Sequence, residues 1–281
     1  MFGQFMSELM NYTFLQKALI TSIIVGVTCG IIGSFITLKG MSLMGDAISH
    51  AVLPGVAISY MMGINFFYGA VVTGLLTALG INYIDQKSRV KADSAIGIVF
   101  SAFFSVGVIL IQKAQSAIDL TSILFGNILT VNDTDQYMTM VVGVSVIFIV
   151  LLFYKELLIT TFDPTMARAY GLPVDLINYG IMILLTLVSV VSLQTVGVIL
   201  VVALLITPAS TAYLLTNDFS KMILLSALIG AIAATAGLYF SFLYNLPSGA
   251  VIVLAAATMF VLALLFAPEQ GLVWRKVKKE I

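Results

Sequence analysis

The sequence has 281 residues, of which 60% are hydrophobic and only 9% are charged. Soluble domains carry about a quarter of their residues as charged side chains, so this composition excludes a water-soluble globular protein. The formal net charge is zero, which gives no indication of nucleic-acid binding. The composition predicts an all-α, polytopic helical bundle, a multi-pass protein of the cell membrane whose main solvent is lipid.

Nine apolar segments follow one another along the chain, each of roughly 16 to 25 residues, the length that crosses a hydrocarbon core. They are 14–38, 46–62, 66–84, 94–113, 139–154, 176–191, 196–214, 222–244 and 250–266. The segments 46–62 and 176–191 are short, and broken or tilted helices are the alternative there, which leaves eight spans in place of nine. No soluble domain interrupts the series, so 1–281 is expected to form a single transmembrane domain.

The basic residues divide unequally between the two sides of a nine-span bundle. One side receives Lys17 and Lys113. The other side receives Lys39, Lys87, Arg89, Lys91, Lys155, Arg168, Lys221, Arg275, Lys276, Lys278 and Lys279. Lysine and arginine accumulate on the cytoplasmic side of membrane proteins. The distribution therefore predicts a cytoplasmic C-terminus and an external N-terminus.

The external loop 114–138 is long, and its charged residues are Asp119, Asp133 and Asp135. An acidic outer surface would raise the local concentration of cations, although an ordinary solvated loop is the alternative. Its apolar stretch 120–130 is consistent with a short re-entrant or surface helix.

The chain contains a single histidine, His50, and Asp46 lies four residues before it. This spacing places both side chains on one face of a helix. Ionisable residues within membrane segments are costly and usually functional. A carboxylate and an imidazole one turn apart can hold a divalent metal, and this donor set suits manganese, iron or zinc better than copper(I). The alternatives are a simple ion pair, or an N-cap formed by Asp46.

Two protein ligands are too few for such a metal, since zinc takes about four and manganese about six. A twofold homodimer would bring two copies of Asp46 and His50 to one axis. Pro54 lacks an N–H group, so the His50 carbonyl loses its helical partner. That carbonyl either faces a pathway or marks a kink in the helix.

Two further segments contain prolines and small residues that indicate a local structure. Residues 164–170 form a short helical pattern that begins with Pro164 and ends near Gly171, as expected of a capped helix. Such a helix on the cytoplasmic face would dock into a partner or lie on lipid headgroups. The small residues around Thr207 and Pro208 favour close helix packing over ligand contact. No stretch resembles the phosphate-binding GxxxxGK[ST] loop, so any ATP must be bound by another chain.

At these residues the sequence resembles a known family. The run 40–55, which contains Asp46 and His50, is similar to the permeases of ATP-binding-cassette importers of manganese, zinc and iron. The similarity continues through 92–97, 124–129 and 206–209, and through the segment that contains Phe162, Asp163, Ala167, Ala169 and Gly171. It covers essentially the whole chain and is greatest to the manganese permeases of Gram-positive bacteria.

The resemblance implies a transport subunit that is not an enzyme and has no cofactor of its own. Two copies would form the pathway through the membrane lipid, two cytoplasmic ATP-binding subunits would drive it, and an extracellular metal-binding lipoprotein or binding protein would deliver the ion. Asp46 and His50 would hold the metal. The coupling segment that contacts the ATPase would contain Phe162, Asp163, Ala167, Arg168, Ala169 and Gly171.

The alternatives that remain open at this stage are a zinc or iron importer of the same family, and a stand-alone secondary transporter. In the second case Asp46 and His50 would act as a proton relay.

Overall fold

A computed structural model of the chain describes residues 2–113, 128–267 and 271, and these residues form helices and short connections without a β-strand. In chain order the helices are α1 (Phe2–Asn11), α2 (Thr13–Leu38), α3 (Met44–Ala51), α4 (Leu53–Met62), α5 (Phe66–Lys87), α6 (Ala92–Lys113), the 3₁₀ turn η1 (Ile128–Thr130), α8 (Asp133–Leu152), α9 (Tyr154–Phe162), α10 (Pro164–Ala169), α11 (Val174–Val196), α12 (Val198–Leu215), α13 (Phe219–Tyr244) and α14 (Ser248–Phe266).

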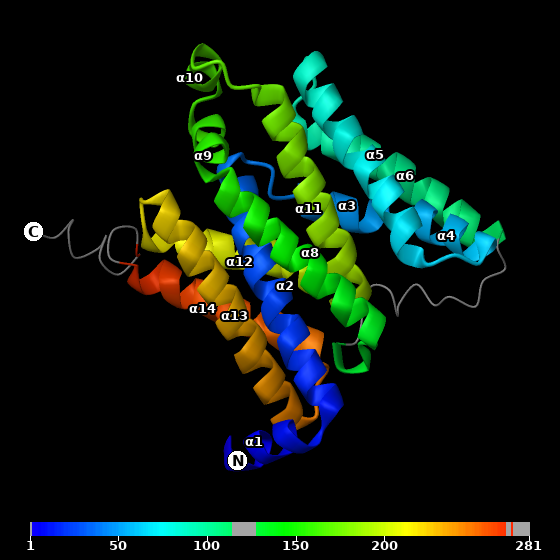
Figure 1. Ribbon diagram of the computed structural model, residues 1–281, viewed down its shortest axis with the longest axis vertical. Coiled ribbons are helices and arrows are strands. Elements are labelled where there is room, and N and C mark those ends of the chain that lie inside the picture. The colour runs from blue at the N-terminus through cyan, green and yellow to red at the C-terminus, as the bar shows by residue number, and fades with distance from the viewer. Residues whose placement is uncertain (1, 114–127, 268–270, 272–281) are drawn as a thin grey trace, which may run out of the picture.

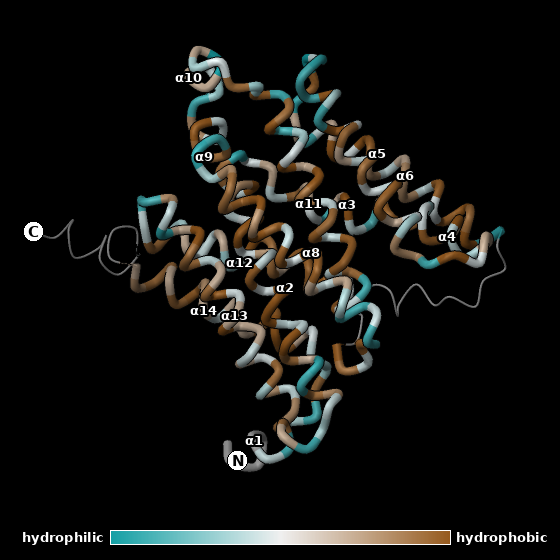
Figure 2. The backbone as a smooth tube through the Cα atoms, viewed as in Figure 1, coloured by the Kyte–Doolittle hydropathy of each residue, from teal (hydrophilic) through white to brown (hydrophobic). Residues whose placement is uncertain are grey.

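Eight of the described helices are long and apolar enough to cross a membrane, namely α2, α5, α6, α8, α11, α12, α13 and α14. Figure 2 shows hydrophobic residues along the helix bodies and hydrophilic residues mainly at their ends and connections. Together with the pair α3–α4, these helices account for all nine apolar segments. The prediction of an all-α bundle is confirmed.

The segment 46–62 is a broken helix, as one of the two readings of the sequence anticipated. Helix α3 ends at Ala51 and α4 begins at Leu53, with Val52 between them. The Val52 N–H still donates to the Ile48 carbonyl at 3.1 Å, an ordinary hydrogen-bond distance. Because Pro54 has no N–H, it cannot continue this series of bonds.

The predicted segment 176–191 is a membrane-length helix, and the alternative of a broken helix does not hold there. Helix α11 runs without interruption over 23 residues. A polar residue near each of its ends has a hydrogen-bond partner. Asn178 accepts a hydrogen bond from Lys39, and the Thr195 hydroxyl donates to the Val191 carbonyl at 3.3 Å. Side chains satisfied in this way are compatible with a membrane helix.

The helices form two groups with α3 between them (Figure 1). Helix α2 packs against α8, α11, α12 and α13, while α4, α5 and α6 pack against one another. The short α3 contacts α5, α6, α11 and α12. Its side chains are therefore placed where the two groups meet.

Small residues allow the central helices to approach closely, as is common in membrane bundles. A Cβ atom built on Gly230 of α13 would lie 2.2 Å from the Gly26 carbonyl oxygen of α2. One turn away, the Ser226 hydroxyl donates to the Gly30 carbonyl at 2.8 Å. A larger residue at this crossing would force α2 and α13 apart.

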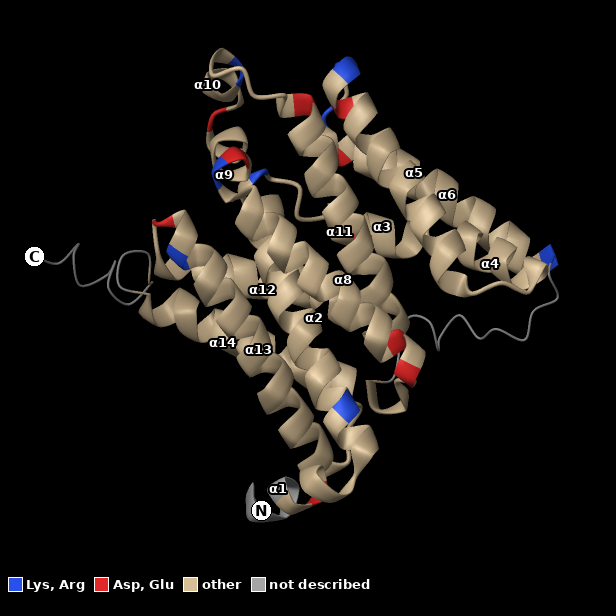
Figure 3. Cartoon of the chain, in the orientation of Figure 1, with Lys and Arg blue, Asp and Glu red and all other residues tan. Residues whose placement is uncertain are grey.

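Charged residues gather at helix ends and connections, notably at the end of the molecule formed by α9, α10 and the α5–α6 turn (Figure 3). At the start of α8, Asp133 forms an ion pair with Lys17 of α2, so part of the acidic charge expected in the external loop is neutralised. Asp119, most of the stretch 120–130 and the basic residues beyond position 271 lie outside the described residues. The orientation of the termini therefore stays a prediction.

Candidate functional site

Helix α3 places Asp46 in its first turn and His50 in its last turn. Both positions suit the helix dipole, which favours acidic groups at the N-terminus and basic groups at the C-terminus. Asp46 Oδ1 lies 3.5 Å from His50 Nε2, and the side chains are 45% and 23% exposed. The prediction that both share one helix face is confirmed. The N-cap is Leu43, so the alternative of Asp46 as the N-cap is wrong.

Two phenylalanines of α6 contact the imidazole of His50. The ring centroid of Phe100 lies 5.7 Å from that of His50, and the ring of Phe104 lies 5.9 Å away in an edge-on arrangement at 86°. Aromatic rings in these geometries attract one another. The pair therefore restricts the orientation of His50. Their spacing of one helical turn was visible in the sequence, but nothing in it indicated that α6 faces α3.

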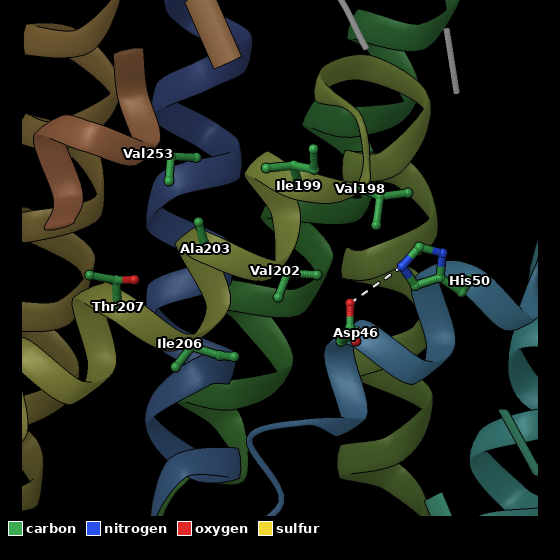
Figure 4. Close-up of a pocket in the computed structure, with 9 residues that line it drawn as sticks. All are labelled: Asp46, His50, Val198, Ile199, Val202, Ala203, Ile206, Thr207 and Val253. Atoms are coloured by element: carbon green, nitrogen blue, oxygen red, sulfur yellow. Dashed lines mark ion pairs between the residues drawn. The ribbon is translucent and has the colours of Figure 1, made fainter. Parts of the chain in front are cut away.

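Asp46 and His50 line a cavity of about 380 Å³ between α3, α12 and α14. Figure 4 shows the two side chains facing α12, with Val202 and Ile206 across the space. The remaining residues that line it are Val198, Ile199, Ala203, Thr207 and Val253. Among the lining residues, Asp46, His50 and Thr207 have polar side chains. The cavity is thus open and mostly apolar, with one polar pair on its wall and one further hydroxyl-bearing residue.

The segment around Thr207 and Pro208, which the sequence interpretation assigned to helix packing, contributes to packing and also to the cavity wall. Pro208 is buried, as packing requires, and lies inside the otherwise continuous α12. Thr207 instead lies on the cavity wall. The signal that could have found it is its place directly before an intramembrane proline, because such a proline leaves a backbone carbonyl that needs another partner.

The side chains of one chain would not by themselves complete a metal site. Within the described part of the chain, no group of three or more histidine, cysteine, aspartate or glutamate residues could hold an ion. Asp46 and His50 offer one carboxylate and one imidazole on a partly exposed face. A divalent ion needs about four to six donors. Water, backbone carbonyls, a hydroxyl such as that of Thr207 or another chain would have to supply the remaining donors.

Residues 11–267 match the family described as the ABC 3 transport family. The chain belongs to this family. Its membership, together with the eight apolar helices, makes it a multi-pass transport protein of the cell membrane and not an enzyme. The resemblance found in the sequence is confirmed.

Individual members of the ABC 3 transport family are similar over almost the full length. The manganese transport system membrane protein MntC of Listeria monocytogenes is 62% identical over 277 residues, 99% of each chain. The manganese import system permease protein ScaB of Streptococcus gordonii is 51% identical over 278 residues, which is 99% of this chain and 100% of ScaB. The solved structure of PsaBC from Streptococcus pneumoniae in complex with Fab matches with a TM-score of 0.88 and 51% identity, covering 100% of both chains.

The expected coupling segment of this family member forms the short helix α10. The Asp163 carboxylate caps it by accepting hydrogen bonds from the Thr165 and Met166 N–H groups, at 3.0 and 2.8 Å. Gly171 follows its end with φ at +79°, which favours glycine. Ala167 is fully buried. These residues shape and anchor the helix.

The outer surface of this segment exposes large side chains. Phe162 is exposed on one side while its ring packs edge-on against Phe219 at 5.5 Å. Met166 and Tyr170 are exposed as well, and so are Arg168 and Ala169. Arg168 Nη2 lies 3.3 Å from Asp175 Oδ1 of α11. An exposed surface of this kind fits either a protein partner or lipid headgroups.

Proposed function

We propose that this chain is the permease subunit of an ATP-driven importer of divalent manganese, and that Asp46 and His50 hold the ion during passage. The observation that carries the proposal is the pairing of the only histidine with a carboxylate on the wall of an apolar cavity. The relatives named for manganese transport and import support the choice of metal. Oxygen and imidazole ligands suit manganese, and they suit zinc and iron too.

The incomplete ligand set supports a homodimer with the ion on its twofold axis. Two copies of Asp46 and His50 give four protein donors, and waters would complete the shell. Two cytoplasmic ATP-binding subunits would contact the exposed surface of α10, and an extracellular metal-binding protein would deliver the ion. In this arrangement the ATPase supplies the energy, and this chain binds and releases the metal.

Uptake of radiolabelled manganese, with zinc and iron as competitors, tests the proposal in cells that contain the whole transport system. Asp46→Ala and His50→Ala should each abolish uptake while the complex still assembles. Asp93→Asn, at an exposed carboxylate of α6, is the matched control and should transport normally. Preferred uptake of zinc or iron by the wild type would reassign the cargo, and uptake by either alanine variant would remove these residues from the pathway.

A mixed dimer tests the shared site. One protomer is wild type and its partner carries both Asp46→Ala and His50→Ala. A single site on the axis predicts that this dimer binds far less than half of the wild-type metal. Binding of half the metal per dimer would show two independent sites.

A further inference from the structure

Lys39 makes a side-chain contact that the proposed metal site does not explain. It follows the last residue of α2, and its Nζ donates a hydrogen bond to Oδ1 of Asn178 in α11. The side chain is partly buried, and burial lowers the pKa of its amine to about 8. None of the ion pairs among the described residues includes Lys39. A buried amine without a counter-ion costs free energy, so this contact calls for a function.

The connection that follows Lys39 leads directly to the metal-binding pair, and it is tight. Gly40 adopts φ of +69°. The Met41 N–H then donates to the Ile36 carbonyl at 3.0 Å, and the Met44 N–H donates to the Met41 carbonyl at 2.9 Å. Met44 is the first residue of α3. Because hydrogen bonds bridge the whole turn, a displacement of the end of α2 moves the start of α3 with it.

The other partner, Asn178, is linked in the same way to α10. Helix α11 begins at Val174, and the Leu172 N–H donates back to the Ala167 carbonyl of α10 at 3.0 Å. Arg168 of α10 pairs with Asp175 in the first turn of α11. Asp175 and Asn178 are three residues apart and lie on neighbouring faces of the helix. The first turns of α11 therefore move with α10.

We propose that the Lys39–Asn178 hydrogen bond couples movements of α10 to the position of α3, and that both residues are positioning residues for transport. The inference rests on the proposed function, in which α10 contacts the ATPase. A displacement of α10 then reaches Asp46 through two rigid turns joined by one side-chain contact. Without that contact, α11 can move while the start of α3 stays in place.

The test uses the complete transporter, with its ATPase, reconstituted in lipid vesicles, and measures manganese uptake and ATP hydrolysis together. Lys39→Met removes the donor and keeps the apolar stem, and Asn178→Leu removes the acceptor. Each should lower the uptake per ATP hydrolysed at least tenfold, while ATP turnover and manganese binding stay within twofold of wild type. The double variant should be no worse than either single one, because both remove the same contact. Lys221→Met, at an exposed lysine, is the control.

A second pair of variants separates coupling from folding. Asn178→Asp keeps an acceptor for Lys39 and should preserve the uptake per ATP, whereas Asn178→Leu should lose it. Three results would each overturn the proposal. The first is that Asn178→Leu imports as much manganese per ATP as wild type. The others are an equal loss in Asn178→Asp and Asn178→Leu, and a loss of uptake that is matched by the loss of ATP turnover. If the wild-type complex itself neither binds nor transports manganese, the proposed function fails first, and the two failures are thereby distinguished.

Discussion

Replacing Phe104 with leucine should weaken metal binding without disturbing assembly. Leucine keeps most of the apolar volume but removes the ring that meets His50 edge-on at 5.9 Å. An aromatic pair of this kind contributes about 0.5–1.5 kcal/mol beyond its buried area. If two protomers share one ion, the loss counts twice and reaches about 1–3 kcal/mol, which corresponds to roughly a 5- to 150-fold weaker binding constant.

The assay is the manganese concentration that gives half-maximal uptake, measured beside the yield and thermal midpoint of the purified complex. Phe103→Leu is the matched control, because Phe103 is the neighbouring phenylalanine of α6 and packs against the hydrophobic core. The half-saturating concentration should rise for Phe104→Leu and stay near wild type for Phe103→Leu. Equal shifts in the two variants, or a lower maximal rate with unchanged half-saturation, would refute the idea that Phe104 orients His50.

Three further changes probe the cavity, the packing and the buried amine. Thr207→Val removes a cavity hydroxyl worth about 0.5–1.5 kcal/mol as a hydrogen bond and should raise the manganese concentration at half-maximal uptake roughly 2- to 12-fold. Thr186→Val is its control, at a buried threonine of α11 that does not line the cavity, and should leave that concentration unchanged. Gly230→Ala places its Cβ 2.2 Å from a carbonyl oxygen of α2 and should destabilise the protein by ~1–3 kcal/mol, which a lower thermal midpoint would show. Gly80→Ala is its control, because no neighbouring atom lies nearer than 4.0 Å to the Cβ that it adds. The pKa of Lys39 is lowered to about 8, so above that pH the unfolded chain binds more protons than the folded chain. The thermal midpoint of wild type minus that of Lys39→Met should therefore rise from pH 8 to about pH 10. A fall of this difference with pH would contradict the prediction.

Local features of this protein could be predicted from sequence because they depend on helix geometry and hydropathy alone. The pairing of Asp46 with His50 follows from their i, i+4 spacing, and α10 follows from its terminal proline and glycine. Contacts between distant segments could not be predicted in this way. The position of Phe104 beside His50 depends on how α6 packs against α3, and the bond between Lys39 and Asn178 joins residues 139 positions apart.

Asn178 lies inside the predicted apolar segment 176–191, although an amide is costly to bury in a membrane. In the folded chain Lys39 supplies a hydrogen-bond donor for the Asn178 side chain, which offsets that cost. A polar residue near the end of a membrane helix is therefore ambiguous until its tertiary partner is known.

If Asp46 and His50 hold the ion, as proposed, the small number of donors in one chain has a consequence for its release. A carrier must bind its cargo and then let it go, and a full ligand set within one protomer would hold the metal in every conformation. Asp46 and His50 instead lie on a short helix between two groups of longer helices, and each proposed protomer provides only half of the donors. A small separation of the two α3 helices would then remove half of the ligands at once, which weakens binding steeply without any change in the residues themselves. If α3 follows α10 through Lys39 and Asn178, the movement that the ATPase drives also separates the two α3 helices and releases the ion. A Lys39→Met transporter lacks this coupling, and it should keep its manganese bound while ATP is hydrolysed.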